Sequence, residues 1–290
     1  MVLQSLVRGA SARLIAAGVP EAEAALDAEL LARHALGWDR ATYVARGREE
    51  APDGLAARLD ALVGRRATRE PVAYIVGAQE FWGRTFTVGP DVLIPRPETE
   101  LIVEEALAWA PGHAPPHVLD IGTGSGCLAV TLALELSGAR VDATDVSRPA
   151  LAIAGRNAER LGAPVAWHEG PFIASALPPF DLIVSNPPYV ADADYGGLQP
   201  EVRDFEPRTA LVGGGPGGLD IVWGVVRAAA AALAPGGRLL MEIGLGQAEA
   251  VARCVADTEG IELLRIRDDL QGIPRVVVVT RAAVPATSSE

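Results

Sequence analysis

The sequence predicts an α/β fold in which a small N-terminal helical domain precedes an open, mainly parallel sheet. Three observations support this prediction. Residues 1–75 place apolar residues at helical spacing, residues 78–95 alternate apolar and polar positions around two turns, and short apolar runs alternate with helical patterns from residue 117 onward. Alternating strands and helices build a parallel sheet with its ligand crevice at the carboxyl ends of the strands.

Residues 1–75 are expected to form the helical domain, with clear helical patterns over residues 21–31 and 55–63. No motif with evident chemistry occurs in this stretch, so we interpret it as a substrate-recognition domain, with a stabilising cap as the alternative. A basic patch, or simply a solvated helix end, would be formed at its end by Arg65, Arg66 and Arg69.

Residues 76–97 are expected to form a β-hairpin linker, with Gly83 and the pair Gly89-Pro90 as turns. The catalytic domain would then occupy residues 98–282, and its first helix would be capped by Glu98 or Thr99. A small polar tail, residues 283–290, is expected to be disordered. The predicted strands of the catalytic domain are 117–121, 141–145, 164–167, 181–185, 238–243, 261–266 and 275–280.

A glycine-rich turn follows the first predicted strand. Residues 118–126 read Val-Leu-Asp-Ile-Gly-Thr-Gly-Ser-Gly, and a helical pattern begins at Cys127. Glycine allows a tight bend and close approach of a ligand, while the helix N-terminus offers free N–H groups. The spacing G-x-G-x-G differs from the dinucleotide fingerprint, and the absence of a following lysine excludes a P-loop. The turn therefore predicts a ligand site, the alternative being a tight connection without a ligand.

An acid ends the second predicted strand at a distance that suits a nucleoside ligand. Asp145 lies 25 residues beyond Asp120, and a carboxylate in this place can accept hydrogen bonds from a ribose diol. Asp142 is the competing acid, but it lies inside the strand. Asp145 could also be a helix-flanking acid without a ligand, since Ser147 and Pro149 open the next helical pattern.

The most informative tetrapeptide is Asn186-Pro187-Pro188-Tyr189, which follows an apolar strand pattern. The Asn side chain offers an amide carbonyl, and prolines lack N–H groups, so this corner presents mainly acceptors. Two adjacent acceptors suit an –NH2 group, which brings two donors. The corner therefore predicts a site that holds an amine or amide nitrogen, while a plain turn after a strand is the alternative.

Composition narrows the classes of function. The net charge of −12 is a poor match for duplex DNA, which calls for a basic surface. Two cysteines are too few for a disulfide framework, and no Cys or His spacing suggests a metal, so we expect none. Cys127 is interpreted as a small packing residue. Without a signal peptide or a long apolar stretch, we expect a cytoplasmic protein that does not bind membranes. We also expect a monomer.

Several spaced motifs together resemble one family. They occur in the order Glu70–Gly77, Phe81-Trp82, Val92–Glu100, Asn186–Tyr189, Glu201–Arg203, Phe205–Pro207 and Pro235–Gly237. The series resembles the class I S-adenosylmethionine-dependent methyltransferases that modify the glutamine side-chain amide of peptide chain release factors. The resemblance runs from about residue 20 to residue 281. It implies a Rossmann-like sheet whose last strand is antiparallel, S-adenosylmethionine as cofactor, and release factors as protein partners.

The resemblance also implies roles for individual residues. Catalysis would fall to Asn186, Pro187 and Tyr189, with Tyr189 covering the substrate as an apolar wall. The substrate would be bound by Asn186, Pro187, Pro188, Tyr189 and Arg96. The cofactor would be bound by Asp120, Gly122, Thr123, Gly124, Ser125, Gly126, Asp145, Pro171, Phe172 and Asn186.

The chain departs from the family pattern in two places. After the third strand, Gly170 stands where an adenine-contacting Asp is expected, and Pro171 stands where an aromatic residue or Leu would cover the ring. Phe172, backbone groups or Glu169 would then hold the adenine. The second departure is the loop 213–218, which lacks the family's Asp-Gly and has an added residue, so its flexibility is expected to differ.

Three alternative functions remain open on the sequence. A DNA adenine-N6 methyltransferase also uses Asn-Pro-Pro-Tyr, but it needs base flipping, and both the net charge and the lack of a DNA-reading domain oppose it. A methyltransferase for a ribosomal-protein glutamine is the second, with Pro97 favouring release factors by resemblance. The third is a binding protein without catalysis, suggested by Gly170 and Pro171.

Overall fold

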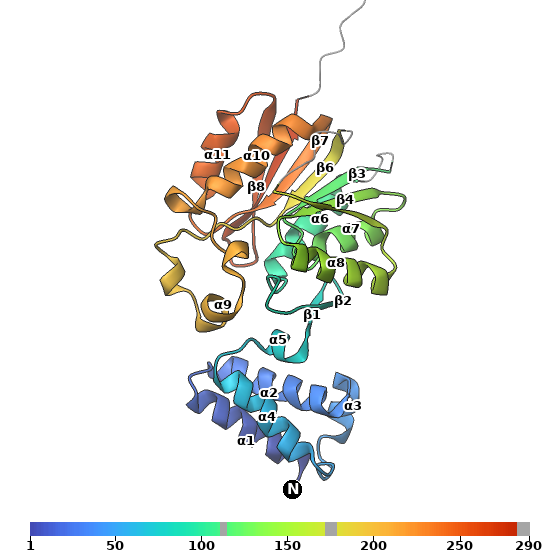
Figure 1. The fold of residues 1–290 in the computed structure, drawn as a ribbon, viewed down its shortest axis with the longest axis vertical. Coiled ribbons are helices and arrows are strands. Elements are labelled where there is room, and N and C mark those ends of the chain that lie inside the picture. Colours follow the sequence, from blue (N-terminus) through green and yellow to red (C-terminus); the bar gives the residue numbers. More distant parts are fainter. Residues whose placement is uncertain (111–114, 172–178, 283–290) are drawn as a thin grey trace, which may run out of the picture. The chain divides into compact units, whose positions relative to one another are not determined.

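The computed structural model describes residues 1–110, 115–171 and 179–282, which form two compact units (Figure 1). The first unit contains Met1–Ala78 together with Gln199–Phe205, and the second contains Gln79–Leu198 and Glu206–Glu290. Phe172 and the tail 283–290, which the sequence analysis assigned to cofactor binding and disorder, lie outside the described residues.

The first unit is helical. Its core is made by apolar side chains that recur every three or four residues along the helices, such as Leu14, Leu31, Leu55 and Leu59. Its helices are α1 (Leu3–Ala16), α2 (Glu21–Leu36), α3 (Arg40–Arg46), α4 (Leu55–Ala67), α5 (Val72–Val76) and α9 (Pro200–Phe205).

Buried ion pairs attach α9 to the other helices of the first unit. Arg66 is 3% exposed and donates to Asp27 (2.6 Å) and Glu201 (2.7 Å), while Arg69 donates to both carboxylate oxygens of Glu201 at 2.6 Å. Burial would raise the pKa of Glu201, but hydrogen bonds from Arg69 and Arg66 outweigh it and lower that pKa. Arg66 and Arg69 are therefore paired with carboxylates inside the first unit. The two predictions for them, a basic patch and a solvated helix end, are both wrong.

The β-hairpin is formed by β1 (Ala78–Phe81) and β2 (Arg84–Thr87). Its two turn residues have positive φ, at 52° for Trp82 and 66° for Gly83, as two-residue hairpin turns require. The rings of Phe81 and Phe86 pack edge to face with their centroids 6.1 Å apart, and both residues belong to the core of the second unit.

The described residues of the second unit form a seven-stranded sheet with the order β5-β4-β3-β6-β7-β9-β8. The strand β9 runs antiparallel to both of its neighbours, and the other strand pairs are parallel. The predicted α/β class and the antiparallel last strand are confirmed. The strands are β3 (His117–Ile121), β4 (Arg140–Asp145), β5 (Val165–Glu169), β6 (Phe180–Ser185), β7 (Leu233–Glu242), β8 (Ile261–Asp268) and β9 (Pro274–Arg281).

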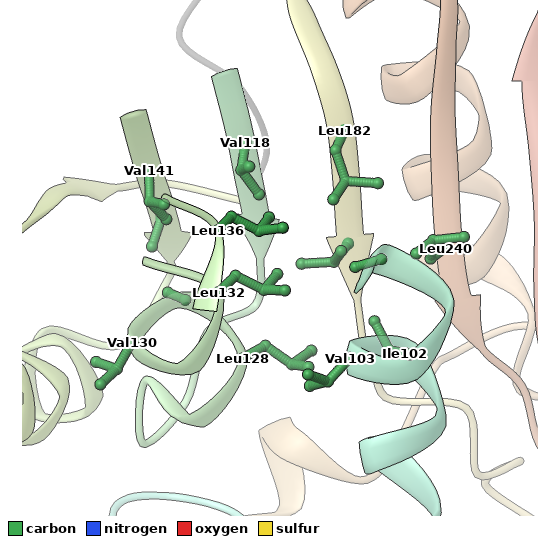
Figure 2. Packing of buried hydrophobic residues seen from close by; sticks show 14 of the residues in the cluster. Ile102, Val103, Val118, Leu128, Val130, Leu132, Leu136, Val141, Leu182 and Leu240 are labelled. Atoms are coloured by element: carbon green, nitrogen blue, oxygen red, sulfur yellow. The ribbon is translucent and has the colours of Figure 1, made fainter. Parts of the chain in front are cut away.

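Successive residues of the central strands point to opposite faces of the sheet, and each face is covered by helices. On one face, Val118, Leu182 and Leu240 pack against α6 (Glu100–Trp109) and α7 (Cys127–Glu135), as Figure 2 shows. Their neighbours Leu119, Ile183 and Met241 pack on the other face against α10 (Asp220–Ala232) and α11 (Ala248–Ala256). The remaining elements are α8 (Arg148–Leu161), η1 (Pro97–Thr99), η2 (Tyr195–Gly197), η3 (Arg208–Ala210) and η4 (Pro216–Gly218).

Candidate active site

Three neighbouring strands end at the same level of the sheet and bring the sequence motifs together. Ile121 at the end of β3 pairs with Thr144 of β4 on one side and with Ser185 of β6 on the other. The next residues, Gly122, Asp145 and Asn186, therefore emerge side by side at the carboxyl edge. This edge is where open α/β sheets bind ligands.

A cavity of about 350 Å³ opens at this edge, within the size range of small-molecule sites. It is bounded by the loop before α6, the turn after β3, the ends of β4 and β6, and segments around η3 and α10. The predicted site residues among its lining are Asp120, Gly122, Thr123, Gly124, Ser125, Asp145, Pro171, Asn186, Pro187 and Pro188.

Residues 122–125 of the glycine turn line one side of the cavity. Gly122 and Gly124 have φ of 72° and 56°, and a Cβ on either would have no atom within 4 Å, so it would project into open space. The N–H groups of Gly122 and Thr123 both donate to the Thr144 carbonyl at 2.9 Å, which closes the turn. Glycine is thus required here for backbone conformation and leaves room for a ligand.

Gly126 has a different role from the one expected. It does not line the cavity, and a Cβ on it would lie 3.0 Å from the Ala154 Cβ and 3.4 Å from the Trp167 ring. Its positive φ of 82° starts α7, and its missing side chain lets α8 pack closely. The structure therefore assigns Gly126 to helix packing rather than to cofactor contact.

Asp120 is a buried acid with one unused oxygen. Its Oδ2 accepts from Thr123 Oγ1 (2.6 Å) and from the Ala129 N–H (3.2 Å), whereas its Oδ1 has no partner among the described residues. Burial raises the pKa of Asp120 to about 7, against the effect of these two hydrogen bonds. A buried acceptor without a partner is costly, so it suits a ligand that brings a donor, such as an ammonium group.

The structure places Asp145 at the cavity and Asp142 away from it, which agrees with the preference for Asp145. Asp145 lines the cavity and accepts from the Gly124 N–H and the Ser147 N–H, both at 2.8 Å. A carboxylate has further lone pairs, so it can still accept from a diol. Asp142 does not line the cavity, because its carboxylate lies between His117 (2.7 Å) and His168 (2.6 Å).

The departure after β5 lies at the cavity wall. Gly170 and Pro171 line the cavity, and the Gly170 N–H donates to the Asp145 carbonyl at 2.9 Å. Glu169 does not line it and instead pairs with Arg148 at 2.6 Å. The structure thus places Glu169 in an exposed ion pair and not at the cavity.

The Asn186 corner, residues 186–189, is anchored by a residue from outside the predicted site. Asn186 Nδ2 donates to Thr99 Oγ1 (2.9 Å), and the Thr99 hydroxyl donates to Glu242 Oε2 (2.6 Å). Thr99 precedes α6 but makes no capping bond there, which corrects the predicted capping role. Because the amide nitrogen is used by Thr99, the Asn186 amide oxygen is directed elsewhere.

Tyr189, which was predicted to cover the substrate, lies behind the corner. It does not line the cavity, its ring lies where a Cβ on Gly244 would approach it to 2.9 Å, and its hydroxyl donates to Glu242 Oε1 at 3.3 Å. Burial raises the pKa of Tyr189, and the Glu242 charge raises it further. Tyr189 therefore anchors the corner from behind.

Gln247 joins three loops behind the corner. Its Nε2 donates to the carbonyls of Tyr189 and Gly217, and its Oε1 accepts from the Gly244 N–H, all at 2.8 Å. A Cβ on Gly218 would lie 2.2 Å from the Tyr189 carbonyl oxygen. The loop 213–218, which was expected to differ in flexibility, is thus packed tightly against the corner backbone.

Arg96 is placed differently from the other predicted substrate residues. It does not line the cavity and donates to Glu206, which also accepts from the Ile94 N–H at 3.2 Å. Burial raises the pKa of Glu206, although the Arg96 charge opposes this. The structure therefore gives Arg96 an internal ion pair that links the loop before α6 to the segment before η3.

Three further expectations concern a reactive thiol, metal-binding side chains and membrane-spanning helices. Cys127 lines the cavity, and burial raises the pKa of its thiol to about 12, so the thiolate is disfavoured. In the described part of the chain, no group of three or more His, Cys, Asp or Glu residues is arranged to hold a metal ion. None of the described helices is long and apolar enough to cross a membrane.

Besides Gln247, two buried polar residues that were not predicted from the sequence support the site. Glu242 ends β7 and stands behind Thr99, and Asn157 bonds Ser125 (2.9 Å) and Thr87 (3.0 Å) from α8. A signal existed for both. Glu242 follows an apolar strand pattern in the same way as Asp145, and Asn157 interrupts the apolar stripe of α8.

Comparison with known proteins agrees with the geometry. Residues 99–198 match the family model of the methyltransferase small domain, and residues 5–77 match that of the PrmC N-terminal domain. The sheet order, the glycine turn and these matches define a class I methyltransferase that uses S-adenosylmethionine. The chain belongs to the release factor glutamine methyltransferase family, as two close relatives establish.

These relatives cover nearly the whole chain. The release factor glutamine methyltransferase of Geobacter sulfurreducens is 51% identical over 88% of this chain and 88% of its own length. The release factor glutamine methyltransferase of Koribacter versatilis is 43% identical over 96% of this chain and 98% of its own length. Among solved structures, a methyltransferase from Pyrococcus furiosus has the same fold, with a TM-score of 0.53 and 19% identity over 76% of this chain and 99% of that chain.

Proposed function

We propose that this protein transfers a methyl group from S-adenosylmethionine to the side-chain amide nitrogen of the glutamine in the Gly-Gly-Gln motif of peptide chain release factors. The observation that carries the proposal is the Asn186 corner, whose amide nitrogen is bonded to Thr99 at 2.9 Å beside the cofactor cavity. The names of the relatives supply the substrate class.

The residues of the cavity fit S-adenosylmethionine. The unpartnered Asp120 Oδ1 suits its ammonium group, Asp145 suits the ribose diol, and the open space above Gly122 and Gly124 leaves room for the ligand. Pro171 would lie against the adenine region, with Phe172 as a further proposed contact. When bound, the cofactor supplies a sulfonium-activated methyl group for in-line displacement.

The corner would act on the nucleophile. An amide nitrogen is weakly nucleophilic because its lone pair is delocalised into the carbonyl. The Asn186 Oδ1 and the Pro187 carbonyl would each accept one N–H of the substrate amide, which aligns the nitrogen and stabilises the positive charge that develops on it. One N–H proton then leaves to water, since no side chain in the described part of the cavity stands out as a base.

The same arrangement would reject glutamate. A glutamate carboxylate brings lone pairs against the two acceptor oxygens, and sites built for a specific hydrogen bond discriminate by about 10⁴-fold or more. Pro188 would line the substrate side, while Tyr189 and Arg96 would act indirectly, through Glu242 and Glu206. We further propose that the first unit recognises the release factor and that the protein works as a cytoplasmic monomer.

The test is a methylation assay with isotopically labelled cofactor and a release factor that carries Gly-Gly-Gln. Mass spectrometry of the Gly-Gly-Gln peptide should show the gain of one methyl group on the glutamine. The control variant Asn186→Ala should bind the cofactor but leave the peptide unmodified. A ribosomal protein or duplex DNA that is methylated in place of the release factor would contradict the proposal.

A further inference from the structure

A buried acid stands behind the Asn186 corner without touching the cavity. Glu242 is 2% exposed and does not line the cavity. It accepts from the Thr99 hydroxyl at 2.6 Å and from the Tyr189 hydroxyl at 3.3 Å. Thr99 in turn accepts from Asn186 Nδ2 at 2.9 Å and does line the cavity. A chain of hydrogen bonds therefore runs from Glu242 through Thr99 to the residue proposed to hold the substrate.

The direction of this chain follows from the chemistry of its members. Glu242 Oε2 accepts from the Thr99 hydroxyl, so the single hydroxyl proton of Thr99 points to Glu242. Thr99 can then only accept from Asn186, and the Asn186 amide must present its nitrogen to Thr99. Its oxygen is consequently turned away from Thr99 and is free to accept from a ligand.

We propose that Glu242, acting through Thr99, is a positioning residue that orients the Asn186 amide so that its oxygen faces the substrate. This orientation would make the enzyme selective for glutamine over glutamate, an inference that rests on the proposed function. A neutral amide at position 242 brings a donor as well as an acceptor, so it no longer fixes Thr99 as the donor of their hydrogen bond. With the Thr99 proton free to point to Asn186, the amide can turn round, and the corner can then present a donor to the substrate.

Several groups favour the charged form of Glu242 against its burial. Burial raises the pKa of Glu242, and the Glu98 charge adds to this effect. The Thr99 hydroxyl, the Arg275 charge and the Tyr189 hydroxyl act in the opposite direction. Burial has the larger effect, so these two donors and the nearby guanidinium offset only part of its cost.

Three variants test the proposal in the full-length protein. Glu242→Gln supplies the neutral partner, Thr99→Val removes the hydroxyl at nearly constant volume, and Thr99→Ser keeps the hydroxyl. The measurements are kcat and KM with a Gly-Gly-Gln release factor, and the ratio of the inhibition constant of its Gly-Gly-Glu form to the KM of the Gly-Gly-Gln form. Calorimetric affinity for S-adenosylmethionine and the Tm report whether each variant folds.

We expect kcat to fall at least tenfold in Glu242→Gln and Thr99→Val, with cofactor affinity within threefold of the wild type. The preference for Gln over Glu should narrow at least tenfold in both, whereas Thr99→Ser should stay within threefold of wild type in every measurement. A merely structural role would weaken both forms equally and leave the ratio unchanged.

The outcomes separate this inference from the proposed function. If the wild type fails to methylate the release factor, the proposed function is wrong. If the wild type is active and the folded variants keep the wild-type Gln/Glu ratio, the role of Glu242 is overturned. If Glu242→Gln does not fold and so cannot bind the cofactor, Thr99→Val decides the matter alone. Valine has nearly the same volume as threonine and suits a side chain that is only 2% exposed.

Discussion

The cofactor half of the cavity, residues 120–125 and 145–147, is built locally, whereas the Asn186 corner is supported by distant segments. In the cofactor half, the acids accept from N–H groups a few residues away or in the turn after the neighbouring strand, as Asp145 does from Ser147 and Gly124. The corner relies on Thr99, Glu242 and Gln247, which lie 87, 56 and 61 residues from Asn186. The comparison teaches that a ligand cradle can be encoded in one motif, while a polarised amide needs a tertiary network.

The largest expected effect separates the two halves. Asn186→Ala removes one acceptor for the developing charge on the substrate nitrogen, and kcat should fall on the order of 10²–10³-fold. Cofactor affinity, measured by calorimetry, should fall much less than kcat, because Asn186 is only one of the predicted cofactor contacts and the cofactor half keeps the others. Equal losses of kcat and cofactor affinity would show that the two halves are not independent.

The cofactor half should respond to pH through Asp120. Its pKa is raised to about 7, so the carboxyl group is protonated below that pH, and the ionised form needed by an ammonium group is lost. Affinity for S-adenosylmethionine should therefore weaken as pH falls below 7, by up to about tenfold per pH unit. Calorimetry between pH 5.5 and 8.5 checks this, and Asp120→Asn should flatten the dependence.

Two glycines of one turn provide a matched pair. Ala at 124 or 126 suffers the same positive-φ strain of about 1–2 kcal/mol, but the added methyl meets open cavity at 124 and the Ala154 Cβ at 3.0 Å at 126. Gly124→Ala should weaken cofactor affinity about tenfold or more with a small loss of Tm. Gly126→Ala should lower Tm further, as thermal unfolding would show; the reverse ranking would contradict the assignment.

The smallest effect on activity is expected at Asp142, which lies outside both halves. Burial would raise its pKa, but hydrogen bonds from His117 and His168 outweigh it, so the folded-state pKa lies below 3.8. Its contribution to stability is present above the unfolded pKa and is lost as pH falls through the folded one. Asp142→Asn should lower the unfolding free energy at pH 7 by about 1–3 kcal/mol. In urea titrations, this deficit should shrink toward pH 3, with kcat per folded molecule unchanged.

Much of the site could be predicted because its motifs are short. The strand–turn–helix pattern around Gly122 and the acid at Asp145 follow from local hydrophobic periodicity, and the register of β3, β4 and β6 brings them to one edge. Tyr189 and Gly126 lie in the right motifs, but their partners, Glu242 and Ala154, are remote in sequence. Sequence spacing cannot show which face of a motif meets a ligand and which meets a packed neighbour.

By itself, the sequence determined the α/β class, the glycine turn, the acid after the second strand and the position of the Asn186 corner after a strand, because each depends on residues within one or two elements. Tertiary structure alone decided that Thr99 holds Asn186, that Glu242 stands behind Thr99, and that Arg66 and Arg96 are consumed by internal ion pairs. The physical reason is that a hydrogen bond has a range of about 3 Å. Its partners are therefore set by which chain segments the packed sheet brings together.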